Sequence, residues 1–139
     1  MSLFERKPPL PDELLPAWQA FRDCAEVVEG GRRTLLATLP VGRVEPAPIA
    51  VGVDALATSL RDALTWMDAW HDVGGLAQEW SDCAAAIDQS AKGLDRVRQV
   101  AANPGELELL QGAVEDVIAP LDTFADAWNA WRRRWRLPR

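Results

Sequence analysis

Apolar residues recur at alternating steps of three and four positions towards the end of the chain. The series consists of Leu107, Leu110, Val114, Val117, Leu121, Phe124, Trp128, Trp131 and Trp135. Such a series forms one stripe along an α-helix that packs against other helices at coiled-coil-like angles. It predicts a helix over about 104–136, with Asn103 as its N-cap and Pro104 in its first turn. Pro120 lies off the stripe and removes one backbone hydrogen bond, so we expect a kink near Asp116 rather than a break.

Three earlier segments carry a similar stripe and predict helices over about 12–39, 53–72 and 76–102. The stripes contain Leu14, Trp18, Phe21, Ala25, Val28, Leu35 and Leu39; then Val53, Leu56, Leu60, Ala63, Met67 and Trp70; and then Leu76, Trp80, Cys83, Ile87, Leu94, Val97 and Ala101. Arg32 and Ser90 are polar exceptions in these stripes. Gly30 and Gly31 each cost roughly 1 kcal/mol relative to alanine inside a helix. Because the first stripe keeps its register across both glycines, we expect one continuous helix there.

The connections between these segments differ in length. Residues 40–52 include three prolines and two glycines, which predicts an extended crossover between the first and second helices. The connections at 72–75 and 102–104 are short, so the helices they join are expected to be antiparallel neighbours. The sequence therefore predicts an all-α, four-helix up-down-up-down bundle. We expect 1–139 to form a single domain, with a proline-rich leader over 1–11.

The chain has seven tryptophans and no tyrosine, and alternating helix directions would gather all seven at one end of the bundle. Three interpretations stay open: a tryptophan core, a pocket for a small molecule, and an interface for a protein partner. Trp66 lies one position off its stripe and is the best single candidate for contact with a partner. The candidate binding residues at this end are Trp66, Trp70, His71, Trp128, Trp131, Arg132, Trp135 and Arg136.

The net charge of −6 hides a strong asymmetry along the chain. Five of the 15 basic residues lie in the last eight positions, so the rest of the chain has 10 basic against 21 acidic residues. Arginines in a last turn are favoured by the helix dipole, and acidic groups at the same end are expected to neutralise some of them. We therefore expect no nucleic-acid and no membrane partner. The excess of arginine over lysine is typical of a GC-rich genome, and we expect a bacterial one.

The sequence offers little catalytic chemistry. A single histidine, His71, excludes sites built from several histidine ligands, and no phosphate loop, nucleophile elbow or C-x-x-C motif is present. Cys24 and Cys83 are too few for a disulfide framework and are expected to be buried thiols. We predict no catalytic residues, no metal site and no cofactor. Without a signal peptide or an apolar stretch of about 20 residues, a cytoplasmic location is expected.

One acidic pattern supports a different alternative. Glu26 and Glu29 on the first helix, and Glu79 and Asp82 on the third, resemble the carboxylate pairs of all-α nucleotide pyrophosphatases. Carboxylates three positions apart share a helix face, and in such enzymes they hold Mg²⁺ against a triphosphate. The two pairs here are separated by a longer stretch than that family uses.

The favoured hypothesis is a non-enzymatic accessory or assembly protein. It would bind a protein partner, or a second copy of itself, through the Trp/Arg-rich end of the bundle. A small-molecule-binding bundle with a Trp-lined pocket and a Mg²⁺-dependent nucleotide pyrophosphatase are the alternatives.

Overall fold

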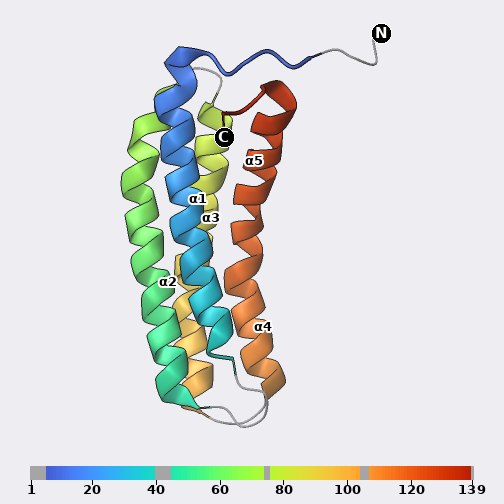
Figure 1. Cartoon of the computed structure of the whole chain (residues 1–139). Coiled ribbons are helices and arrows are strands. Elements are labelled where there is room, and N and C mark those ends of the chain that lie inside the picture. The colour runs from blue at the N-terminus through green and yellow to red at the C-terminus, as the bar shows by residue number, and fades with distance from the viewer. Residues whose placement is uncertain (1–5, 40–44, 74–75, 104–106, 139) are drawn as a thin grey trace.

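The computed structural model describes residues 6–39, 45–73, 76–103 and 107–138. In this part of the chain, helical rods lie side by side as an all-α four-helix bundle, which confirms the predicted fold class (Figure 1). The first three rods are α1 (Leu15–Ala37), α2 (Pro46–Met67) and α3 (Ala77–Ala102). The fourth combines α4 (Leu107–Ile118) and α5 (Asp122–Arg134). In Figure 1 the chain descends along α1, climbs along α2, descends along α3 and climbs again through α4 and α5.

Short 3₁₀ turns extend or join these helices. They are η1 (Asp12–Leu14) before α1, η2 (Asp68–Trp70) after α2 and η3 (Ala119–Leu121) between α4 and α5. The predicted helix of 12–39 thus corresponds to η1 and α1, and that of 76–102 to α3. The predicted start of the fourth helix falls on 104–106, which lie outside the described residues. Asn103, expected as the N-cap of the fourth helix, instead caps α3: its backbone N–H and its Nδ2 both donate to the carbonyl oxygen of Gln99.

The prediction that the second helix begins at residue 53 was wrong. α2 begins at Pro46, seven positions earlier, so the described part of the predicted extended crossover is largely helical. The first N–H groups of a helix have no intrahelical acceptor, and the proline φ angle is already close to helical, so prolines fit a first turn. Pro46 occupies the first position of α2 and Pro48 the third, after an extended Glu45.

The effect of Pro120 was predicted correctly in kind but not in place. The chain continues from α4 into α5 without a loop, but the irregular turn is η3 at the proline itself rather than a kink near Asp116. The apolar stripe crosses this turn in register, because Val117, Leu121 and Phe124 are all buried. Packing of the stripe therefore keeps the two helices in one rod.

α1 continues through Gly30 and Gly31, as predicted, and only the second glycine is required by packing. A Cβ on Gly31 would lie 2.5 Å from the Oγ of Ser59 and 3.1 Å from the Cα of Leu56, both on α2. A Cβ on Gly30 would meet nothing within 4 Å. Gly31 thus lets the backbones of α1 and α2 approach each other closely.

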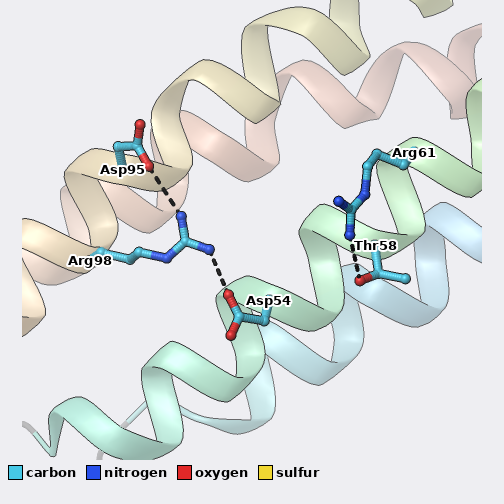
Figure 2. Close-up of polar contacts among 5 residues, drawn as sticks. All are labelled: Asp54, Thr58, Arg61, Asp95 and Arg98. Atoms are coloured by element: carbon cyan, nitrogen blue, oxygen red, sulfur yellow. Dashed lines mark hydrogen bonds and ion pairs between the residues drawn. The ribbon is translucent and has the colours of Figure 1, made fainter.

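One aromatic and aliphatic core runs the length of the bundle, built from the predicted stripes of all four rods. At the surface, Arg98 of α3 links the second and third rods: its guanidinium contacts Asp54 of α2 at 2.6 Å and Asp95 of α3 at 3.1 Å (Figure 2). All three side chains are solvent-exposed, so this bridge adds little to stability. None of the helices in the described part of the chain has both the length and the apolar character that crossing a bilayer requires.

Candidate functional site

Most of the tryptophans meet in one cluster, where the start of α1, the end of α2 and the end of α5 come together. The Trp18 ring lies 4.8 Å from Trp128 and 5.3 Å from Trp131, measured between ring centroids. Phe21, one turn along α1, lies 5.6 Å from Trp70. The rings of Trp131 and Trp135 are 5.5 Å apart. These contacts place residues that are far apart in the sequence at the same end of the bundle.

The inner members of this cluster belong to the core. Trp18, Trp70 and Trp131 are at most 2 % exposed. Of the sequence-predicted binding residues, Trp70 and Trp131 are therefore out of reach of a partner. These buried rings pack between the helices, where each fills a large volume of the core.

An open groove of about 810 Å³ lies above this core, between the beginning of α1 and the end of α5. We call it the basic groove. Its walls are formed by Arg6, Lys7, Trp18, Arg22, Trp128, Arg132, Trp135, Arg136, Leu137 and Pro138. Five of these residues are cationic and none is acidic, in a chain whose net charge is −6. Four sequence-predicted residues are brought together here, namely Trp128, Trp135, Arg132 and Arg136.

Helical spacing explains the two main walls. Trp128 and Arg132 are four positions apart on α5, and Trp18 and Arg22 are four positions apart on α1, so each pair stacks along one helix face. Trp128 and Trp135 are only partly buried, and they offer ring surface to the groove. The result is an aromatic floor with guanidinium groups around it.

The third wall comes from the leader, which is extended and docked on the C-terminal segment. The N–H of Arg136 donates to the carbonyl oxygen of Pro8 at 2.8 Å, and the N–H of Leu10 donates to the carbonyl oxygen of Arg136 at 3.3 Å. The Lys7 ammonium donates to the carbonyl oxygen of Arg132. These bonds hold the cationic groups of Arg6 and Lys7 beside those of α5.

The expected neutralisation by acidic groups is found for one arginine of the tail. Arg134 pairs with Glu79 of α3 at 3.0 Å and lies 5.8 Å from the centre of the Trp135 ring. In the described part of the chain, no ion pair joins Arg22, Arg132 or Arg136 to a carboxylate.

Besides the buried Trp70 and Trp131, two further predicted residues lie outside the groove walls. Trp66 on α2 is 44 % exposed, which fits its position off the apolar stripe. His71 is half exposed; its Nδ1 lies 2.8 Å from an Asp72 carboxylate oxygen and its ring packs edge-on against Trp80. Neither residue lines the basic groove.

The acidic pairs do not assemble into one site. Glu29 is paired with Arg32 and Arg33, and Glu79 with Arg134. Among the residues that the structure describes, no three histidine, cysteine, aspartate or glutamate side chains gather as metal ligands would. Each pair keeps its place on one helix, Glu26 and Glu29 on α1 and Glu79 and Asp82 on α3, without forming a larger cluster among these residues.

Comparisons with known proteins give no relative. No family model, no curated protein and no solved structure matches this chain.

The predicted binding residues did not include six wall residues of the groove: Arg6, Lys7, Trp18, Arg22, Leu137 and Pro138. The spacing of Trp18 and Arg22 was a usable signal, because it repeats that of Trp128 and Arg132. The leader gave no such signal. Its docking depends on backbone hydrogen bonds of an irregular segment, which leave no periodic pattern in the sequence.

Proposed function

We propose that this protein is a non-enzymatic accessory or assembly protein that binds a protein partner at the basic groove. The observation that carries the proposal is the groove itself, where five cations surround tryptophan rings on a chain of opposite net charge. Tryptophan and arginine are the residue types most enriched among the dominant contacts of protein interfaces. The buried rings beneath make the floor rigid, which lowers the entropy that binding would cost. The two buried free thiols suit a reducing compartment, and we propose the cytoplasm.

A partner of defined negative charge fits better than a long polyanion. Five of the 15 basic residues line the groove, whereas the ten others stand against 21 acidic residues, so the surface outside the groove would repel an extended nucleic acid. The groove is concave and aromatic, so it matches a protruding segment that carries carboxylates beside apolar side chains.

A small organic anion is the second candidate, favoured by the size of the groove. Its volume of about 810 Å³ falls within the range of ligand pockets. Native mass spectrometry of protein purified from its own cell separates the two candidates. A retained mass of a few hundred daltons identifies a ligand, and its absence together with protein capture identifies a partner.

The test first uses the full wild-type chain as bait to capture binding proteins in the native cell. It then compares how tightly the wild-type chain and two charge-reversed variants bind those proteins. Arg132→Glu/Arg136→Glu reverses two groove charges. Arg133→Glu/Arg96→Glu makes the same change in net charge at two exposed positions that do not line the groove. Proteins captured by the wild-type chain are purified and their Kd values measured against all three proteins.

We expect the groove variant to weaken binding at least about tenfold, which corresponds to ~1.4 kcal/mol, and the matched control to bind like the wild type. Equal Kd values for the groove variant and the wild type would contradict the proposal. Equal losses in both variants would assign the effect to net charge rather than to the groove.

A further inference from the structure

The basic groove is one end of a longer depression between the first and fourth rods. A second hollow of about 290 Å³ continues from it and shares Trp128 with it. A third hollow of about 610 Å³ follows and shares Arg32 and Asp122 with the second. All three lie between α1 and the α4–α5 rod and adjoin one another at these shared residues; we call this row of hollows the furrow.

Large aromatic side chains explain why the furrow exists. α1 packs closely on α2, where Gly31 and Gly52 allow near contact of the backbones. Between α1 and α5, by contrast, aromatic rings from both helices pack against each other. The ring centroids of Phe21 and Phe124 are 6.3 Å apart, and those of Trp18 and Trp128 are 4.8 Å apart. These rings separate the two backbones in the half of the bundle that contains α5, and the first two hollows lie beside them.

The chemistry of the furrow changes along its length. The basic groove at one end has only cationic, aromatic and apolar walls. The middle has both signs of charge, with Glu29 and Asp122 near Arg32. The far end has apolar walls at Leu36, Leu39 and Ile118 beside the polar side chains of Gln111 and Glu115, and Leu36 is 40 % exposed.

We propose that the furrow receives an amphipathic α-helix of the protein partner, with acidic residues at the end that enters the basic groove. This inference rests on the proposed function and specifies the chemistry of that partner. From Trp18 to Leu36 the furrow extends for roughly 30 Å at 1.5 Å per residue, which matches a helix of about 20 residues. A straight depression between two helices is the standard receptor for such a segment. Charge complementarity sets its direction, because carboxylates match the five cations and apolar residues match Leu36, Leu39 and Ile118.

Photo-crosslinking along one rod tests this proposal on the full chain. A benzophenone amino acid replaces Asn129, Ala119 or Gln111, three exposed positions on the furrow. Asp126 and Asp116, exposed on the same rod but outside the furrow, serve as controls. Circular dichroism confirms that each variant folds, and mass spectrometry identifies the attached residues.

We expect the three furrow positions to label one helical segment of the same protein, with its acidic end at Asn129 and little labelling from the controls. Asn129 and Ala119 are ten residues apart on a helical rod, which corresponds to about 15 Å. A helical partner segment spans that distance with about ten residues, and an extended segment spans it with about five. The separation between the two labelled residues of the partner therefore distinguishes the two conformations. A spacing of five, an adduct with a second copy of this chain, or equal labelling from the controls would overturn the inference.

The failure of this inference differs from that of the proposed function. Labelling from Asn129, which follows the groove residue Trp128, but not from Ala119 or Gln111, together with loss of binding in Arg132→Glu/Arg136→Glu, limits the site to the groove end of the rod; this result overturns the furrow and keeps the proposed function. No labelling at any furrow position and unchanged binding in that variant contradicts both.

Discussion

At the scale of single residues, the two adjacent glycines of α1 have opposite roles. Gly30 faces open space, whereas Gly31 faces Ser59 and the backbone at Leu56. Gly30→Ala should raise the free energy of unfolding by up to about 1 kcal/mol, because alanine favours the helix. Gly31→Ala should lower it by roughly 1–3 kcal/mol, since α2 must move to admit a methyl group. Urea unfolding followed by circular dichroism measures both, and equal effects of the same sign would contradict the close approach.

The two buried cysteines predict a loss of stability at alkaline pH. Burial raises the pKa of the Cys24 thiol to about 12, and burial followed by the nearby Cys24 raises that of Cys83 as well. In the unfolded chain both thiols ionise near pH 9, so above that pH the unfolded state binds fewer protons than the folded state. The contribution of the two thiols to the free energy of unfolding should therefore be complete below pH 9. Above pH 9 it should fall by up to about 1.4 kcal/mol per pH unit for each thiol.

The measurement is the urea midpoint between pH 7 and pH 11. Cys24→Ala/Cys83→Ala is the control, because it removes both ionisations while keeping small apolar side chains in the core. The double variant should lose most of the alkaline slope. The same slope in both proteins would show that other groups cause it.

At the scale of elements, one ion pair connects the end of α5 to the start of α3. Glu79 is 8 % exposed and Arg134 is its partner at 3.0 Å. Arg134→Ala should lower the free energy of unfolding by about 1–2 kcal/mol, because it removes the counter-charge that the structure gives the buried Glu79 carboxylate. In a Glu79→Gln background the same change should cost less than about 0.5 kcal/mol. A double-mutant cycle of thermal or urea unfolding measures the difference, and an equal cost in both backgrounds would mean that the pair contributes nothing.

The apolar stripes were sufficient to predict the helices, but the prolines were not sufficient to place their ends. Pro46 and Pro48 suggest an extended segment when the sequence alone is considered, although a proline is compatible with a first helical turn and incompatible only with later ones. Pro120 was expected to disturb the helix one turn earlier, and the 3₁₀ turn instead absorbs the missing hydrogen bond locally. Both errors have the same cause. A proline is tolerated where the backbone N–H that it lacks would have had no acceptor, and a single sequence does not show at which positions that is so.

At the scale of the whole molecule, the sequence predicted where tryptophans and arginines meet but not the shape of the surface they make. Alternating helix directions were enough to bring Trp18 near Trp128 and Trp131. The groove also depends on the leader, whose docking on Arg136 is a matter of backbone hydrogen bonds, and on ring sizes that separate α1 from α5. Those are properties of the packed structure, so no stripe or spacing indicated them.

Whether the basic groove is a binding surface can be measured from the indole NMR signals of the seven tryptophans. The ¹⁵N-labelled full chain is titrated with the partner purified by capture, and single Trp→Phe variants assign the signals. Trp128 and Trp135 lie in the groove, while the equally observable Trp66 lies outside its walls. The account predicts that the indole signals of Trp128 and Trp135 shift on binding and that the signal of Trp66 does not. A shift of Trp66 alone, with Trp128 and Trp135 unchanged under saturating partner, would contradict it.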